Sequence, residues 1–321
     1  MLKDWKWISP PVQSFAGLPV ITNLDNLEAD IAILGLHYTS PYSQLNPSQA
    51  VQNRMQTAPA AIRRQSSIFT NHLNHYDFDF NDTLLANQDI QIVDCGDIDR
   101  ELSDGLPQPE HITTAIRTLL DKGAVPIAIG TDEGSAIFAL RAYHGYQSLC
   151  VVHVDAHIDW RDERDSVRDG YSSVMRRASE MPWVQFMAQV GLRGIGSARQ
   201  KEVDDAHSFG SILIRARDVH KQGIDTCLER IPPADHYIIT IDADALDTAI
   251  APGVLFPSPG GLTFDETTDL IKGISSKGRI VGMNLFEVRP ERDVNDITAA
   301  TGAQLIINFI GVLAHSGQLG K

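Results

Sequence analysis

Cysteine, positive charge and long apolar runs are all scarce in this sequence, and each scarcity excludes a class of protein. Three cysteines in 321 residues, with no CxxC pair, do not make a disulfide framework and are typical of free thiols in a reducing compartment. Lys and Arg number 27 against 41 Asp and Glu, and the formal net charge of −14 argues against nucleic acid and anionic membranes as partners. No apolar stretch reaches the roughly 18 residues of a membrane helix. We therefore expect a cytoplasmic protein.

Two common catalytic motifs are missing as well. The sequence contains no GxSxG, which excludes the nucleophile turn of α/β hydrolases, and no GxGxxG after an apolar run, which excludes a dinucleotide-binding loop. The nearest run, Gly191–Ser197, has its glycines at the wrong spacing. Hydrophobic residues make up 43% and charged residues 21%, a composition that is ordinary for a folded chain and excludes a disordered one.

Short apolar runs recur along the chain and alternate with helical patterns. Such runs are typical of strands buried on both faces, as in a parallel sheet. Between them, Thr263 and Glu266 form a capping box at the start of an amphipathic segment that extends to Ile274. The alternation predicts a doubly wound α/β domain. The predicted strands contain Ala32–Leu36, Ile90–Val93, Val125–Ile129, Leu149–Val154, Val190–Leu192, Ile212–Ile214, Tyr237–Ile241 and Ile280–Leu285.

We expect the chain to divide into an arm and one domain. Residues 1–30 are polar and turn-rich, with Trp5 and Trp7 among them, and are predicted to be an N-terminal arm that packs on a neighbouring subunit or on its own body. Residues 31–321 show no linker, repeat or low-complexity tract and are expected to form a single domain. The Ser-, Gln- and Asn-rich segment Tyr38–Thr57 is predicted to be a long loop, a kind of segment that is often functional.

Acidic residues and one histidine follow directly after two of the predicted strands. They are Asp155, His157 and Asp159 after the first, and Asp242 and Asp244 after the second. In an extended chain, residues two apart project to the same side, so each set points into one space. A single such cluster is usually a turn or a helix cap. Two clusters at strand ends are better explained by a divalent cation, because carboxylates packed this closely repel one another and are costly to bury.

These residues resemble motifs of the ureohydrolases, the family of arginase, agmatinase and guanidinobutyrase. HVDAHID, around Asp155, is similar to the family's DAHxD motif, and IDADALD, around Asp242, is similar to its DxDxxD motif. Four further segments are similar to the family's GPxAIR, DxGD, aPGxxxPxpGGL and vExxPxxD motifs; they are Ala58–Arg63, Asp94–Asp97, Ala251–Leu262 and Phe286–Asp293. The matches follow one another in order between residues 31 and 310, and they look closest to the agmatinase branch.

The resemblance implies a three-layer α/β/α fold with an eight-stranded parallel sheet, in a homo-oligomer such as a trimer or hexamer. It implies two divalent ions, manganese or nickel, held by the five residues above, with Asp159 and Asp242 shared between the ions. Asp159 would also hold and pass a proton, and Glu287 would bind the guanidinium of a small cationic substrate. The implied reaction hydrolyses a C–N bond of a guanidino-type compound (agmatine-like, guanidine or biguanide) to urea or a urea-like product and an amine.

Two positions depart from the family pattern. Glu133 stands where the GGDHS motif has its first ligand histidine, and we expect its carboxylate to bind the same ion through oxygen. The histidine that agmatinases carry before an RRA-like stretch is absent, and Ser173 is the nearest polar substitute at the substrate. We interpret His153 as a histidine of the core or of the layer behind the ligands, facing away from His157.

The loss of two histidines leaves a second hypothesis open. The chain would then be a catalytically impaired family member with a structural or regulatory role, in a hetero-oligomer with an active paralogue. Both acidic motifs are intact, and this favours the enzyme, because a subunit under no catalytic demand would be expected to lose them too. The residues identify neither the metal nor the tail of the substrate.

Overall fold

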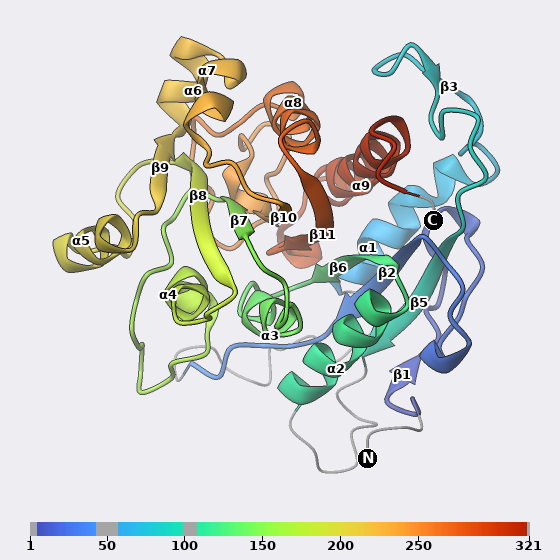
Figure 1. Cartoon of the computed structure of the whole chain (residues 1–321), viewed down its shortest axis with the longest axis horizontal. Coiled ribbons are helices and arrows are strands. Elements are labelled where there is room, and N and C mark those ends of the chain that lie inside the picture. The colour runs from blue at the N-terminus through green and yellow to red at the C-terminus, as the bar shows by residue number, and fades with distance from the viewer. Residues whose placement is uncertain (1–4, 43–56, 99–107, 320–321) are drawn as a thin grey trace.

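The computed structural model describes residues 5–42, 57–98 and 108–319. Most of the predicted loop Tyr38–Thr57 therefore lies outside the described residues. Within the described part, the elements alternate along the chain as the apolar runs predict, and Figure 1 shows them stacked as helices, sheet and helices. The α/β class and the three layers are thus confirmed.

A nine-stranded sheet runs through the centre of the described part of the chain. Eight of its strands are parallel. Seven of them contain a predicted apolar run in full, whereas β5 begins at Ile92 and contains only the second half of the run Ile90–Val93. Our expectation of eight strands was one short, because a two-residue strand of the arm joins one edge antiparallel to its neighbour. In spatial order the strands are β1 (Ile8–Ser9), β5 (Ile92–Ile98), β2 (Ile31–Leu36), β6 (Val125–Gly130), β11 (Arg279–Phe286), β10 (His236–Asp242), β7 (Leu149–Val154), β8 (Val184–Leu192) and β9 (Ile212–Arg215).

Helices cover both faces of the sheet, and each face encloses its own hydrophobic cluster. One layer contains α1 (Ala58–Gln65), α6 (Ala216–Gln222), α7 (Ile224–Arg230), α8 (Phe264–Ser275) and α9 (Ile297–His315). The other contains α2 (Gln108–Asp121), α3 (Ser135–Arg141), α4 (Val174–Ser179) and α5 (Gln200–Phe209). A small hairpin of β3 (Tyr76–Asp77) and β4 (Asp82–Thr83) stands apart from the main sheet (Figure 1).

Two helices show how sequence features set the elements. The capping box predicted for α8 is present, because the Thr263 hydroxyl accepts from the Glu266 N–H and the Glu266 carboxylate accepts from the Thr263 N–H. Among the described residues there is one helix, α9, that is both long enough and apolar enough to cross a membrane. However, 78% of its apolar window is buried inside the molecule, so we interpret α9 as a core helix.

The arm packs on the chain's own body. Besides β1, it contributes the buried side chains of Phe15 and Leu24 to the two hydrophobic clusters. The Phe15 N–H donates to Asp94 Oδ2 at 2.8 Å, which ties the arm to β5. This packing explains the ninth strand, while the division into an arm and a single domain stays a prediction.

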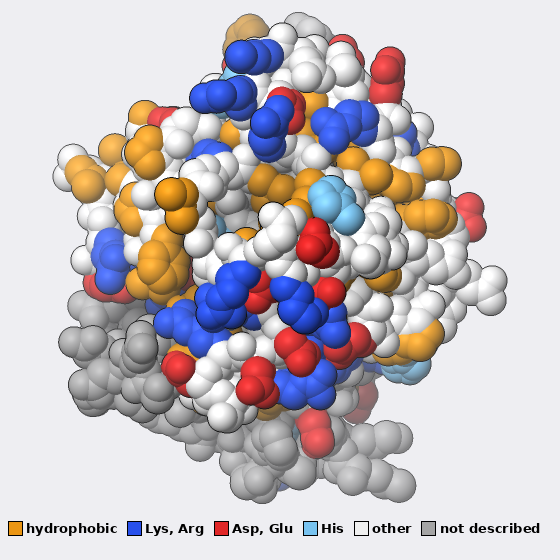
Figure 2. Space-filling view, turned by 90° about the vertical axis from the view of Figure 1, so that its left-hand side faces the viewer, with side chains coloured by type: hydrophobic (Ala, Val, Ile, Leu, Met, Phe, Trp, Pro, Cys, Tyr) orange, Lys and Arg blue, Asp and Glu red, His pale blue; other side chains and the backbone are white. Residues whose placement is uncertain are grey.

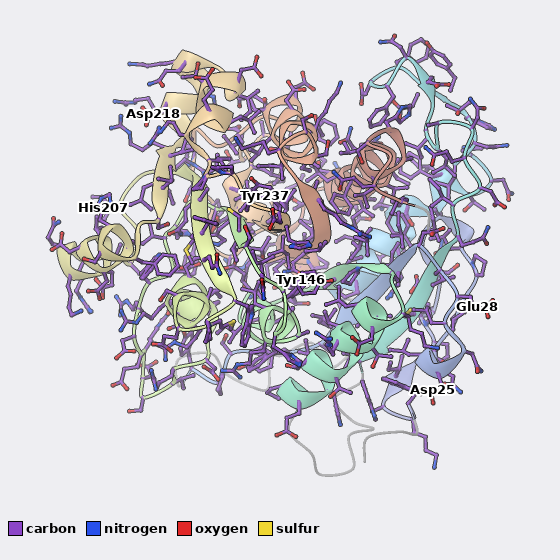
Figure 3. All side chains as sticks on the ribbon, in the orientation of Figure 1. Asp25, Glu28, Tyr146, His207, Asp218 and Tyr237 are labelled. Carbon is purple, nitrogen blue, oxygen red and sulfur yellow. The ribbon has the colours of Figure 1, made fainter. Side chains whose placement is uncertain are left out.

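Outside the buried clusters described below, many charged side chains lie at the periphery. Figure 3 shows Asp25, Glu28 and His207 projecting outward, whereas Tyr237 lies in the interior. Figure 2 shows basic and acidic side chains interleaved on one face. Solvent-exposed ion pairs contribute about 0–1 kcal/mol each. We therefore interpret this face as solvated.

Candidate metal centre

The predicted ligands gather at the carboxyl edge of four adjacent strands. Glu133 follows β6, Glu287 follows β11, Asp242 ends β10, and Asp155 follows β7. These strands are neighbours in the order β6, β11, β10 and β7, so segments far apart in the sequence meet at one place. Ligands of open parallel α/β sheets bind at this edge.

One group of possible ligands consists of Asp155, His157 and Asp244. The His157 Nδ1 lies 3.1 Å from Asp244 Oδ2 and 3.4 Å from Asp155 Oδ1, and one ligand atom from each residue falls within 4.8 Å of the others. A Cβ at Gly196 would lie 2.7 Å from His157 Cδ2, so this glycine leaves room for the imidazole ring. The arrangement offers two carboxylates and one imidazole to a cation.

A second group consists of Glu133, His153, Asp155 and Asp159, all of them buried. His153 Nε2 lies 2.9 Å from Glu133 Oε1, 2.9 Å from Asp155 Oδ2 and 4.0 Å from Asp159 Oδ2. The residue common to both groups is Asp155, whose Oδ1 faces His157 and whose Oδ2 faces His153. The expectation that Asp159 and Asp242 are shared between two ions stays a prediction; among the described residues, Asp155 is the residue that both groups contain.

Asp242 lies beside these groups without belonging to either. Its Oδ1 accepts a hydrogen bond of 2.7 Å from the Asp244 N–H and so fixes the turn after β10. Burial, together with the charges of Asp244 and Asp155, raises the pKa of the Asp242 carboxyl well above its ordinary value. Its role as a ligand stays a prediction.

The electrostatics of the cluster favour a cation. Burial and the charge of Asp155 raise the pKa of Glu133, and burial and the same charge raise that of Asp159. Burial raises the pKa of Asp244 to about 6. Burial opposes protonation of His157, but its hydrogen bonds to Asp155 and Asp244 outweigh burial and raise its pKa to about 11. Each shift compensates for negative charge, which a divalent ion would neutralise directly.

Two buried oxygens show that the residues present fit a metal. Glu133 Oε2 and Asp155 Oδ2 receive no hydrogen bond from the described residues. A buried carboxylate oxygen without a donor is costly, and a bound cation removes that cost. Oxygens from several carboxylates with an imidazole nitrogen form a donor set for first-row divalent metals.

Glu287 lies at the same edge, but the chain's own groups already pair both of its oxygens. Its Oε1 accepts the Glu133 N–H at 3.0 Å, and its Oε2 accepts from Arg289 Nη2 at 2.9 Å. Its backbone is held at a φ of 62°, which is uncommon for a residue with a side chain. Burial raises the pKa of Glu287 to about 7, although Arg289 acts in the opposite direction.

Ser173 is completely buried at the start of α4, and its hydroxyl has no hydrogen-bond partner among the described residues. The neighbouring helix approaches the centre through backbone bonds, because the N–H groups of Met175 and Arg176 donate to the Asp159 carbonyl. Contact between Ser173 and a substrate stays a prediction.

Sequence reasoning missed Gln189 and Arg289, and it placed His153 in the core or in the layer behind the ligands without giving it a contact there. Our interpretation of His153 as facing away was wrong, because residues 153 and 155 are two apart in one strand and share a face. The signal was therefore present in the spacing. Gln189 and Arg289 reach the centre from β8 and from the segment after β11, and no spacing motif marks them. Asp247, which follows the Asp242–Asp244 cluster, fixes a loop, since its carboxylate accepts the N–H groups of Ala249, Gly260 and Gly261.

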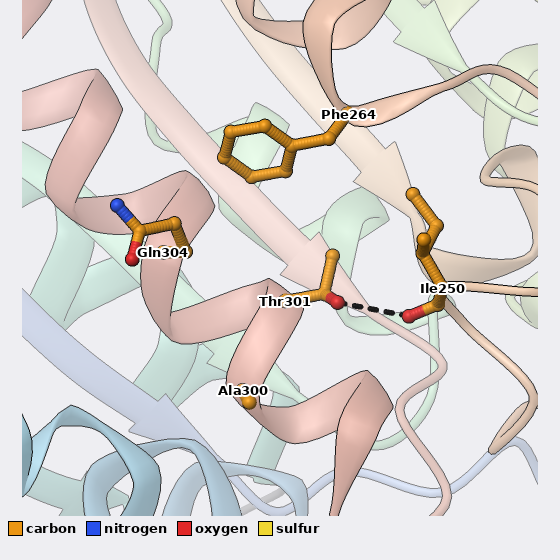
Figure 4. Close-up of a pocket in the computed structure, with 5 residues that line it drawn as sticks. All are labelled: Ile250, Phe264, Ala300, Thr301 and Gln304. Carbon is orange, nitrogen blue, oxygen red and sulfur yellow. Dashed lines mark hydrogen bonds between the residues drawn. The ribbon is translucent and has the colours of Figure 1, made fainter. Parts of the chain in front are cut away.

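A shallow apolar hollow lies elsewhere, between the start of α8 and α9 (Figure 4). Thr301 donates there to the Ile250 carbonyl at 2.8 Å. Its lining contains no titratable side chain and offers no chemistry; the lining residues are Ile250, Phe264, Ala300, Thr301 and Gln304.

Comparison with known proteins identifies the family. The model of the Arginase family matches residues 29–311, so the chain belongs to the arginase family. Agmatinase from Citrobacter koseri is 27% identical over 304 residues, which cover 94% of this chain and 92% of that protein. The structure of proclavaminate amidino hydrolase from Streptomyces clavuligerus matches with a TM-score of 0.77 at 24% identity, over 97% of this chain and 99% of that chain. Formimidoylglutamase from Bacillus subtilis matches with a TM-score of 0.77 at 21% identity, over 96% and 92% of the two chains.

Proposed function

We propose that this chain is a metal-dependent amidinohydrolase that uses two divalent ions to hydrolyse a C–N bond of a guanidino-type compound. Water adds to the guanidino carbon, the C–N bond to the substrate's tail breaks, and urea or a urea-like product leaves together with an amine. The substrates we propose are agmatine-like compounds, guanidine or a biguanide. The similarity to an agmatinase and to an amidino hydrolase supports this class of reaction.

The observation that carries the proposal is the pair of ligand groups that share Asp155. One group contains His157 and Asp244, and the other contains Glu133 and Asp159. A carboxylate that belongs to both groups suits a centre whose residues would hold two divalent ions. When bound, such ions supply positive charge and lower the pKa of a water molecule towards neutrality. We propose manganese or nickel, because the donors are mostly oxygen with imidazole nitrogen in addition.

The remaining roles belong to the chain's own side chains. Asp159 would hold a proton beside the reacting carbon and pass it to the departing amine, as a carboxyl group does in general acid–base catalysis. Glu287 would receive the substrate's guanidinium through paired hydrogen bonds. To do so, its Oε2 must exchange Arg289 for the substrate. Ser173 would contact the substrate from the start of α4.

One observation favours the second candidate, a catalytically impaired subunit beside an active paralogue. Arg289 is itself a guanidinium, and it occupies the carboxylate oxygen that a guanidino substrate would need. A chain that keeps this internal pair would bind metal but not the substrate. The ligand groups are nevertheless complete, and for this reason we place the enzyme first.

The experiment that tests the proposal combines a metal assay with a substrate panel. Protein loaded with Mn²⁺ or Ni²⁺ is tested with guanidino and biguanide compounds, and urea-type products are measured. We expect up to two ions per chain and release of a urea-type product from at least one compound. Two bound ions with no product, followed by activity only after mixing with a paralogue, would identify the impaired subunit. A chain that binds neither metal would contradict both candidates.

A further inference from the structure

His153 reaches the middle of the carboxylates, and its two ring nitrogens have different partners. Its Nε2 lies 2.9 Å from Glu133 Oε1. Its Nδ1 lies 3.0 Å from Gln189 Nε2. Strands β7 and β8 place these two residues directly opposite each other in their register. Both side chains are completely buried, so water does not compete for these contacts.

Two partners fix the orientation of the Gln189 amide, because one can only donate a hydrogen bond and the other can only accept one. Trp160 Nε1, which can only donate, lies 2.7 Å from Gln189 Oε1, and the Ser211 hydroxyl donates to the same oxygen at 3.1 Å. The carbonyl of Ile158, which can only accept, lies 2.9 Å from Gln189 Nε2. The nitrogen of this amide therefore faces His153 and donates to its Nδ1.

This orientation determines the tautomer of His153. Because Nδ1 accepts a hydrogen bond, it carries no hydrogen, and the proton of the neutral ring lies on Nε2. The Nε2–H then donates to Glu133 Oε1. A metal ligand needs a free lone pair, and a ligating histidine usually donates its other N–H to an acceptor. His153 shows the reverse arrangement, with a donor behind Nδ1 and a proton directed at the carboxylates.

We propose that His153 is a positioning residue that holds Glu133 in place and does not itself bind metal. The hydrogen bond satisfies Oε1 of Glu133 and leaves its buried Oε2, which has no donor, as the oxygen offered to a cation. A glutamate in place of a histidine is longer and more flexible, and the histidine from the adjacent strand restrains it. This inference deepens the proposed function and rests on it for the identity of the site.

The first test counts imidazole nitrogens at the metal. Protein labelled with ¹⁵N-histidine is loaded with Mn²⁺, and directly bound nitrogens are detected by electron spin-echo envelope modulation. We expect one class of coordinated imidazole, from His157, which disappears in His157→Asn and persists in His153→Gln. A second coordinated imidazole that disappears in His153→Gln would overturn the proposal.

A pair of substitutions then separates positioning from ligation. The side-chain amide in His153→Gln would keep an N–H near Glu133, whereas His153→Leu removes the donor. We expect His153→Leu to weaken Mn²⁺ binding roughly 10- to 100-fold in calorimetric titrations, the range found for residues that orient ligands, and His153→Gln to recover most of this loss. Equal losses in the two variants would contradict the restraint of Glu133 by a donated hydrogen bond.

A substitution of Gln189 reverses the tautomer. In Gln189→Glu, the carboxylate accepts from Nδ1, the proton leaves Nε2, and the freed lone pair faces the metal. We expect a second imidazole signal in this variant, with Gln189→Met as the control that removes the donor without adding an acceptor. Because these variants disturb a buried network, long-range ¹H–¹⁵N NMR of the metal-free wild type gives an independent test. A proton on Nδ1 of His153 would overturn the proposal even if no metal binds.

The results also separate this inference from the proposed function. A chain that binds Mn²⁺ through one imidazole but hydrolyses no guanidino compound keeps the role of His153 and loses the proposed activity. A chain that hydrolyses its substrate with two imidazoles on the metal keeps the activity and loses the positioning role.

Discussion

Asp155 is the residue on which the two ligand groups depend, because its two oxygens face opposite sides of the centre. The sequence predicted which acidic residues would meet at this edge, since parallel strands end together and alternate residues share a face. The sequence did not predict which of these residues would belong to each of the two ligand groups. The pairing of Glu287 with Arg289 and the amide behind His153 are set by contacts between segments far apart in the sequence, which local spacing does not encode.

Substitution of Asp155 should therefore remove metal from both groups. We expect Asp155→Asn to bind less than about one tenth of the wild-type content of Mn²⁺, because it removes one charge from each group at once. Asp247→Asn is the matched control. Asp247 lies in the loop after β10, and its carboxylate accepts hydrogen bonds from backbone N–H groups. Metal analysis by mass spectrometry measures both. Wild-type metal content in Asp155→Asn would show that Asp155 is not a ligand.

The raised carboxyl pKa values predict how stability depends on pH without metal. The pKa of Asp244 is raised by burial to about 6 and that of Glu287 to about 7, so the folded chain keeps protons that the unfolded chain loses near pH 4. Their stabilising contribution is complete below the unfolded values and is lost as pH rises through the folded values. The raised pKa of His157 acts in the same direction at higher pH.

We therefore expect the raised pKa values of Asp244 and Glu287 each to cost the metal-free protein on the order of 3 kcal/mol of stability between about pH 4 and pH 8. Saturating Mn²⁺ should flatten this dependence, because the ion replaces the protons. Urea unfolding at several pH values, with and without Mn²⁺, measures both curves. If the metal-free protein instead became more stable as the pH rises over this range, the predicted dependence of stability on pH would be contradicted.

At the level of elements, the apolar runs identify the parallel strands because these strands are buried on both faces and need almost continuous apolar sequence. The sequence pattern marks the ends of these strands less clearly. β8 begins at Val184, well before the predicted run at Val190. The prediction missed this first part because it is partly exposed and includes a polar residue. β1 has two residues and exists only because β5 offers an edge, so no local pattern marks it.

The capping box of α8 allows a test of one element without the metal centre. We expect Thr263→Ala to destabilise the protein by about 1 kcal/mol, because the side chain caps the Glu266 N–H. Thr268→Ala, at a half-buried position inside the same helix where the hydroxyl donates only to the Asp265 carbonyl, should change stability by less than about 0.5 kcal/mol. Urea unfolding measures both, and Mn²⁺ content should match the wild type. Equal effects of the two substitutions would show that the cap contributes nothing particular.

At the level of the whole molecule, one buried arginine joins α1, β5 and the arm. Arg63 donates to both oxygens of Asp94 at 2.8 and 2.9 Å, and it also pairs with Asp97. Asp94 in turn accepts the Phe15 N–H. The segments similar to GPxAIR and DxGD thus meet in one ion pair, for which we see a structural role. The order of the motifs along the sequence did not predict this contact. Assembly into a homo-oligomer or with a paralogue, and a cytoplasmic location, stay predictions.

Removal of this arginine should destabilise the entire fold. Arg63→Met leaves the fully buried charge of Asp94 without its ion-pair partner and removes one partner of the half-buried Asp97, and we expect a loss of about 3–5 kcal/mol. The double variant Arg63→Met/Asp94→Asn should recover part of the loss, because it removes one unpaired charge. Thermal and urea unfolding compare the three proteins. A loss below about 1 kcal/mol in the single variant would mean that the pair does not hold the arm and the sheet together.

The central claim about this protein is that two cations share one aspartate. Anomalous diffraction from crystals grown with Mn²⁺ locates such ions directly. We predict two manganese peaks on either side of Asp155, one beside His157 and Asp244 and the other beside Glu133 and Asp159. Data on both sides of the manganese absorption edge assign the peaks to the metal. No peak at this carboxyl edge, or manganese bound only elsewhere on the chain, would contradict the account.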